Sequence, residues 1–163
     1  MPEPTTDDSV AREVLSDGAR ALAHEGEPSA SLHRILDSVA ARLGIASAAV
    51  VASEDDHVHR AIVASHGLGE ADLAGLTRAI ENPAHPIART VAEPVATFDV
   101  RPTNPGGPAL RCHLPLTVTR DGSEVVLGVL ALAYDRPLDA PARRLLEAIA
   151  DLAAIALERL PRS

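Results

Sequence analysis

The stretch ALRCHLPLTVTRDGSEVVLGVLALAY, residues 109–134, decides the fold of this chain. It reads as two strands, residues 109–119 and 124–134. Asp121-Gly122 between them is a favoured pair for a tight turn, because Gly and Asp tolerate the positive φ angles that such turns require. The sequence therefore predicts a long β-hairpin.

The segments before the hairpin alternate between helix and strand patterns, separated by Gly and Pro breakers. The strongest pattern lies in residues 29–43, where Leu32, Ile35, Leu36 and Val39 form one apolar stripe. Gly44 follows where a left-handed helix cap belongs. The other expected elements are helices at 8–25, 70–81 and 86–92, strands at 45–53, 57–65 and 94–98, and a loop at 99–108.

A long helix is expected after the hairpin, over residues 139–160. Asp139 is placed to cap it, Pro141 suits its first turn, and Pro161 ends it. Its apolar arc is wider than one packing face requires, so we expect a sheet on one side and a partner helix on the other. The arc consists of Leu145, Leu146, Ile149, Leu152, Ile155, Ala156 and Leu160.

Composition excludes several classes of function. All 15 basic residues are Arg, so a Schiff-base lysine and a Walker-type phosphate lysine are excluded. The net charge of −8 and the scarcity of aromatic residues argue against nucleic acid as a partner. The chain has one Cys, no signal-peptide pattern and no apolar run near 20 residues, so we expect a cytoplasmic protein without a membrane span.

The order of these elements resembles the GAF domain family. Leu114-Pro115-Leu116 followed by residues 128–132, Gly-Val-Leu-Ala-Leu, is similar to the hairpin of that family, and residues 137–157 are similar to its carboxyl-terminal ending. The resemblance covers about residues 29–160. Residues 1–28 are then an extension with a helix, and 161–163 a tail. The chain looks like a single-domain bacterial member of actinobacterial type, and we expect it to have no output domain.

The resemblance implies an α/β (α+β) fold with a central antiparallel sheet. Helices 29–43 and 139–160 would pack on one face, while short helices and loops would roof a small-molecule pocket on the other. It also implies a homodimer formed through those two helices. A sensor without an output domain would report through a partner protein, which the sequence does not identify, or through its own assembly.

Strand alternation selects candidate ligand-binding residues. If Leu130 and Leu132 face the helices, Ala131 and Ala133 face the pocket and leave room for a ligand. Similarity to bilin-binding members places Arg111 and His113 on the same side. Arg111 could pair with a ligand carboxylate or phosphate, or simply extend to solvent. His113 could hydrogen-bond a ligand or ligate a metal, or simply fill the cavity.

Two further histidines, His66 and His85, are candidates from the roof of the pocket; the alternative is a cap or turn role. A metal site at His57-x-His59 is disfavoured, because a metal needs three or four convergent ligands. The cofactor is left unknown, and three are disfavoured: haem, because the loop at 101–108 has no His; covalent bilin, because Cys112 lies inside the strand; and cyclic nucleotide, because the family signature needs Lys.

The functional expectation is a small-molecule-binding sensory domain that acts as a homodimer rather than an enzyme. An interaction or dimerisation module, whose pocket is filled by its own side chains, is the alternative. Methionine sulfoxide reductases of this family resemble the chain in size. Their chemistry captures a sulfenic acid with a second thiol, and Cys112 has no resolving partner, so that activity is disfavoured.

Overall fold

The computed structural model describes residues 8–23, 27–54, 59–102 and 107–160. The expected His57 and part of the turn before it lie outside these residues. The elements are α1 (Asp8–Ala23), α2 (Pro28–Leu43), β1 (Ser47–Ser53), β2 (Arg60–His66), α3 (Glu70–Ala79), α4 (Pro86–Ala92), β3 (Thr97–Val100), β4 (Leu110–Arg120), β5 (Ser123–Tyr134) and α5 (Ala140–Glu158).

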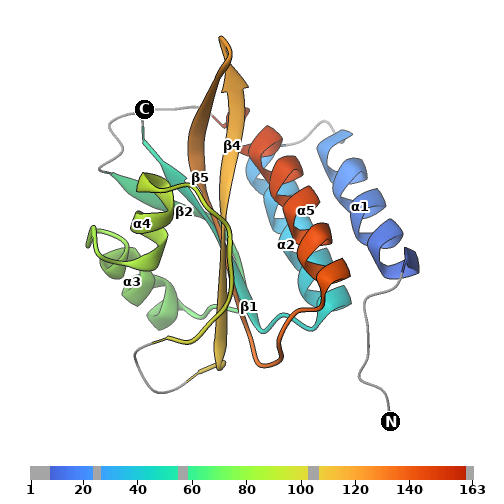
Figure 1. The fold of residues 1–163 in the computed structure, drawn as a ribbon, viewed down its shortest axis with the longest axis horizontal. Helices are drawn as coiled ribbons and strands as arrows, with labels where there is room; N and C mark the ends of the chain where they lie inside the picture. Colours follow the sequence, from blue (N-terminus) through green and yellow to red (C-terminus); the bar gives the residue numbers. More distant parts are fainter. Residues whose placement is uncertain (1–7, 24–26, 55–58, 103–106, 161–163) are drawn as a thin grey trace.

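The strands form one five-stranded sheet in the order β2-β1-β5-β4-β3, and every neighbouring pair is antiparallel. Helices α1, α2 and α5 cover one face, and α3 and α4 lie on the other (Figure 1). The predicted α+β architecture is therefore confirmed. Among the described residues no helix has the length and apolar character needed to cross a membrane.

The predicted hairpin is the centre of this sheet. Strands β4 and β5 pair along their whole length, with Leu114 opposite Leu130. At the turn, Asp121 has a φ of 51° and Gly122 a φ of 78°. These two positive angles match the right-handed twist of the flanking strands, which explains why this dipeptide joins them.

The alternation of side chains across the hairpin is also as predicted. Leu130, Leu132 and Cys112 belong to the large apolar core between the sheet and the three helices. Val129 belongs to a smaller apolar cluster on the opposite face. Because successive side chains of a strand point to opposite faces, this assignment also determines the side on which the neighbouring residues lie.

Both predicted helix caps are present. The left-handed Gly44, with a φ of 67°, ends α2 and donates its N–H to Ala40 O. The carboxylate of Asp139 accepts a hydrogen bond from Ala142 N at 2.8 Å and so begins α5. Each contact satisfies a backbone group that the end of a helix would otherwise leave unpaired.

Helix α1 changes the interpretation of the wide apolar arc on α5. It packs against both α2 and α5 within the same chain (Figure 1). The approach is close at Gly18, where an added Cβ would lie 2.9 Å from Leu152 Cδ1. Part of the surface that we expected a second chain to cover is therefore covered by α1. Ile155 remains 41% exposed.

The edge strand β3 begins three residues later than predicted. Pro94 has no N–H to donate, and Val95 N donates to Glu93 O at 2.8 Å, so this segment turns instead of pairing. Residues 97–100 then pair with β4 at two positions only, Thr97 with His113 and Val100 with Arg111. The register shifts between those positions, so β3 contains a bulge.

Candidate functional site

Four of the six predicted ligand-binding residues lie on adjacent positions of β4 and β5. His113 pairs with Ala131, and Arg111 with Ala133. Alternation places these pairs on the face that α3 and α4 cover, opposite the large core. The structure thus brings together the strand residues that the sequence selected.

The same face has an apolar floor. Five buried side chains fill the space between the sheet and the two short helices, with Ala131 packed against them. Two come from the central strands, one from the turn after α3 and two from α4. They are Val51, Ile80, Ile87, Val91 and Val129.

His113 is the most deeply buried ionisable group of this face. Its side chain is only 5% exposed, and no hydrogen bond joins it to any other described residue. Burial, His85 and Arg111 together lower its pKa from 6.5 to about 4. The imidazole is therefore neutral at physiological pH and offers one donor and one acceptor nitrogen.

His85 approaches the same place from the opposite side. It caps α4, and its Nδ1 accepts a hydrogen bond from Ile87 N at 3.1 Å. Burial first, and then the nearby Arg60, lower its pKa. The cap role weighed for this residue is therefore present. A charge on His85 would lower the pKa of His113, in keeping with the packing of α4 against β4.

Two guanidinium groups flank the imidazoles. Arg60 donates from Nε to Ile80 O at 2.7 Å, which ties β2 to the end of α3. Arg111 donates from Nη1 to Pro108 O at 2.6 Å and to Leu110 O at 3.2 Å. These acceptors are neutral carbonyls, and Arg111 forms no ion pair with a carboxylate of the described chain. Among the described residues its positive charge therefore has no ion-pair partner.

His66 does not join this group. Its Nδ1 lies 2.7 Å from Asp37 Oδ1, a residue of α2 in the helical layer. Its place in the roof of the pocket, expected from sequence, is therefore wrong: it links the edge strand β2 to the opposite side of the sheet. A surface carboxylate that becomes a neighbour only through tertiary packing leaves no local signal in the sequence.

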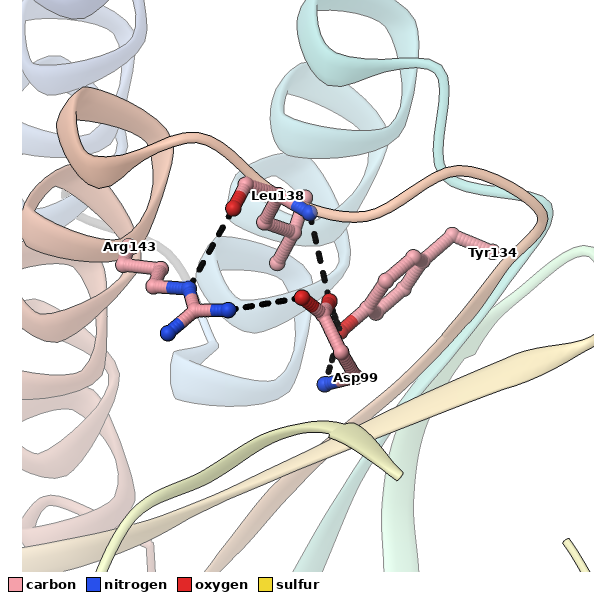
Figure 2. A network of polar contacts seen from close by, with 4 residues as sticks. All are labelled: Asp99, Tyr134, Leu138 and Arg143. Carbon is pink, nitrogen blue, oxygen red and sulfur yellow. Dashed lines mark hydrogen bonds and ion pairs between the residues drawn. The ribbon is translucent and has the colours of Figure 1, made fainter. Parts of the chain in front are cut away.

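A second polar cluster, which the sequence interpretation missed, surrounds Asp99 (Figure 2). The Asp99 carboxylate accepts hydrogen bonds from Tyr134 OH at 2.8 Å and Leu138 N at 3.2 Å. It also forms an ion pair with Arg143 Nη2 at 2.6 Å. Although burial opposes it, these hydrogen bonds and the charge of Arg143 lower the pKa of Asp99, so it is ionised.

Asp99 has a left-handed backbone conformation, which few residues other than Gly adopt. Its φ is 54°, and its N–H donates to Tyr134 OH at 2.8 Å. Arg143 in turn lies over the ring of Phe98, 5.1 Å from the centroid. The one Phe and the one Tyr of the chain therefore meet at this cluster. In the sequence, this cluster could have been suspected only because the single Phe and the single Tyr are each followed by an Asp.

The structure offers no support for a reactive cysteine or a metal site among the described residues. Cys112 is completely buried, and burial raises the pKa of its thiol, so the reactive thiolate is disfavoured. Within the described residues no three His, Cys, Asp or Glu side chains are grouped for a metal ion. His59 is exposed, while its expected companion His57 lies outside the described part.

A cavity of about 500 Å³ lies on the helical side of the sheet, away from His113. The end of α2, the start of α1 and the connection from β5 to α5 form its walls. Its lining residues are Val10, Arg42, Leu43, Gly44, Ala142 and residues 134–139.

The fold and the arrangement of its two faces identify the class of protein. The family model for the GAF domain matches residues 27–158. The chain therefore belongs to the GAF domain family, whose members are commonly sensory or regulatory modules. A search of curated protein sequences found no match.

Solved structures agree with this assignment at the level of the fold. The GAF domain of an Acinetobacter phosphoenolpyruvate-protein phosphotransferase is 12% identical and has a TM-score of 0.71, covering 94% of this chain and 95% of that one. Free methionine-R-sulfoxide reductase from Neisseria meningitidis, in complex with its substrate, is 15% identical with a TM-score of 0.71, covering 97% and 95%. The second GAF domain of DevS from Mycobacterium smegmatis is 21% identical with a TM-score of 0.58, covering 80% and 93%.

Proposed function

We propose that this GAF domain is a sensory module that binds a small anionic molecule between β4 and α4. The observation that carries the proposal is His113, an imidazole that is 5% exposed and has no hydrogen-bond partner among the described residues. Among the described residues no fully buried side-chain nitrogen or oxygen lacks a hydrogen-bond partner, so the unbonded ring nitrogens of His113 keep some contact with the surface. They are therefore free to hydrogen-bond a polar group of a ligand.

Local charge favours an anion over a cation. Arg111 is the nearest fixed charge on β4, it acts on His113, and it has no carboxylate partner in the described residues. Arg60 exerts the same kind of field on His85. A carboxylate or phosphate would meet donors on two sides, and a guanidinium recognises either group through paired hydrogen bonds.

A bound anion would change the protonation of His113. An opposite charge nearby favours the imidazolium, so the pKa of His113 rises from about 4 when the anion binds. Binding then takes up a proton, and the affinity increases as the pH falls towards 5. This coupling distinguishes binding at His113 from binding elsewhere on the surface.

The alternative function is a ligand-free interaction module. The five-residue apolar cluster under α3 and α4 favours it, because these side chains already occupy the space beside Ala131. In that case His113 and Arg111 are structural groups at the border of a filled face. Catalysis of the methionine sulfoxide reductase kind is the least favoured, since Cys112 is buried and has no second thiol.

The first test is native mass spectrometry of the full chain purified from its own host, with an absorption spectrum. A reproducible extra mass per chain, lost on denaturation, supports the sensor. Isothermal titration with inorganic phosphate, acetate and hexanoate at pH 5.5 and 7.5 follows. We expect tighter binding at pH 5.5 and loss of binding in Arg111→Gln.

The control is Arg120→Gln, an arginine at the exposed end of the same strand that pairs with Glu158 at 3.2 Å. It removes an equal charge from β4 without touching the site, so its affinity should match that of the unmodified protein. Equal losses in both variants would indicate a general charge effect. No adduct, and no heat with any anion, would favour the interaction module.

A further inference from the structure

The edge strand β3 contacts both functional regions of the molecule at once. Its backbone pairs with β4 opposite the two proposed ligand residues, Thr97 with His113 and Val100 with Arg111. Between these two pairs the register shifts at Phe98 and Asp99. A bulge of this kind turns a side chain away from its regular side of the strand.

The turned side chain is that of Asp99, and it reaches the start of α5. Its carboxylate accepts from Leu138 N at 3.2 Å in the connection before the helix and pairs with Arg143 at 2.6 Å in its first turns (Figure 2). Arg143 also donates from Nε to Leu138 O at 3.2 Å. Asp99 and Arg143 thus hold the same peptide segment from two sides.

The contacts around Asp99 hold a conformation that would not persist alone. A non-glycine residue with a φ of 54° lies in the left-handed region, which L-residues rarely adopt. The Asp99 N–H and its carboxylate both bond to Tyr134 OH, at 2.8 Å each. If β3 shifted along β4, this geometry and the link to α5 would be lost together.

We propose that the Asp99 bulge transmits the occupancy of the His113–Arg111 face to the start of α5. The step is direct, because Arg111 pairs with Val100, the residue next to Asp99. A ligand that draws Arg111 away from Pro108 O and Leu110 O alters the end of β4 at that pair. The coupling rests on the proposed anion binding for its signal, but the mechanical link can be tested without a ligand.

The same link reaches a part of the surface that a partner could contact. Leu138 and Tyr134, both bonded to Asp99, line the cavity of about 500 Å³ between α1, α2 and the β5–α5 connection. Release of Leu138 from Asp99 would therefore change this cavity as well as the first turn of α5. The regulated output would be at the helical layer, on the opposite side of the sheet from the ligand.

The test is a cycle of four proteins: unmodified, His113→Gln, Asp99→Asn and the double variant. Hydrogen–deuterium exchange of residues 138–146 measures how often the start of α5 opens. We expect His113→Gln to change that exchange rate about fivefold or more, the lower range of typical site coupling, and to have almost no further effect once Asp99 is Asn. An equal effect of His113→Gln in both backgrounds would overturn the coupling.

Asp121→Asn is the matched control, because Asp121 also has a positive φ, 51°, but lies in the hairpin turn. Asn tolerates such angles, so both substitutions preserve the backbone, and only the Asp99 variant loses the ion pair with Arg143 of α5. In the Asp121→Asn background the effect of His113→Gln should persist. Arg143→Gln, which leaves the bulge residue intact, should abolish it as Asp99→Asn does.

Titration with hexanoate separates failure of the coupling from failure of the proposed function. Tyr134 is the one Tyr, and there is no Trp, so intrinsic emission reports on the Asp99 cluster alone. Calorimetric binding with a change in emission, lost in Asp99→Asn, supports both proposals. Binding without any change in emission overturns the coupling only, whereas absence of binding to any tested anion counts against the ligand site and leaves the exchange cycle to decide the coupling.

Discussion

The burial of His113 predicts a specific acid sensitivity of the fold. Its pKa in the folded protein is about 4, against 6.5 for an ordinary His. In the unfolded chain the imidazole takes up a proton near pH 6.5, but in the folded chain it does not. The stabilising contribution of neutral His113 is therefore fully present above pH 6.5 and is lost as the pH falls towards 4.

The size of this loss in unfolding free energy follows from the difference between the pKa values of His113 in the unfolded and folded chain. At pH 5, about 1.5 units below the ordinary pKa and still above the folded one, linkage at about 1.36 kcal/mol per unit gives a loss of about 2 kcal/mol relative to pH 7.5. Replacement by Gln, which is polar but does not titrate, should remove this loss. His85 is retained in both proteins, so its own titration largely cancels in the comparison.

The assay is urea unfolding followed by circular dichroism at pH 7.5 and pH 5 for the unmodified protein, His113→Gln and the control His33→Gln. His33 is exposed on α2, with Nδ1 3.0 Å from Ser29 O. We expect the pH-dependent loss of unfolding free energy to be about 2 kcal/mol smaller in His113→Gln than in the other two proteins. Equal losses in all three would refute the assignment of a buried, neutral His113.

Further predictions concern packing, capping and assembly. In Gly128→Ala the new Cβ would meet the Val51 carbonyl oxygen, a backbone atom, so we expect a loss of about 3 kcal/mol in unfolding free energy. Gly75→Ala, in open space on α3, should instead add about 0.5–1 kcal/mol. Asp139→Ala should lower the melting temperature through loss of an N-cap worth about 1 kcal/mol. Sedimentation at high protein concentration should show a homodimer that Ile155→Glu dissociates; a strictly monomeric protein would contradict this assembly.

The elements of the fold could be predicted because their signals are local. Asp121-Gly122, Gly44 and Asp139 each specify the conformation of their own turn or cap, and all three occur as expected. The side chains of the hairpin follow from alternation once one of them is assigned to the core. This is why Arg111 and His113 could be placed on the correct face without a structure.

The neighbours of these residues could not be predicted, because they come from distant segments. His85 acts on His113 only because α4 packs on the sheet. His66 contacts Asp37 only because α2 packs on the other side of the sheet. Asp99 was expected to begin a loop. No local sequence pattern predicts the left-handed conformation of Asp99, because it is held by Tyr134, 35 positions further along the chain.

Burial of His113 also constrains what the ligand must be. We expect an anion to engage an imidazole that is only 5% exposed when α4 moves aside, and α4 is held by Ile87 and Val91, which are 1% and 7% exposed. Burying an aliphatic side chain is worth about 1.5–3 kcal/mol, so exposing both would cost about 3–6 kcal/mol. At about 1.4 kcal/mol per tenfold, this opening would weaken the apparent affinity roughly 10²- to 10⁴-fold.

A purely polar anion cannot recover that cost, because it leaves the exposed apolar surface in water. A ligand with an apolar body beside its charged group can, since it would take the place of Ile87 and Val91 against the floor formed with Val51 and Val129. We therefore expect hexanoate to bind more tightly than acetate or inorganic phosphate, although all three offer an anionic group to Arg111. The apolar cluster that favours the ligand-free alternative is, in this view, the surface that selects the ligand.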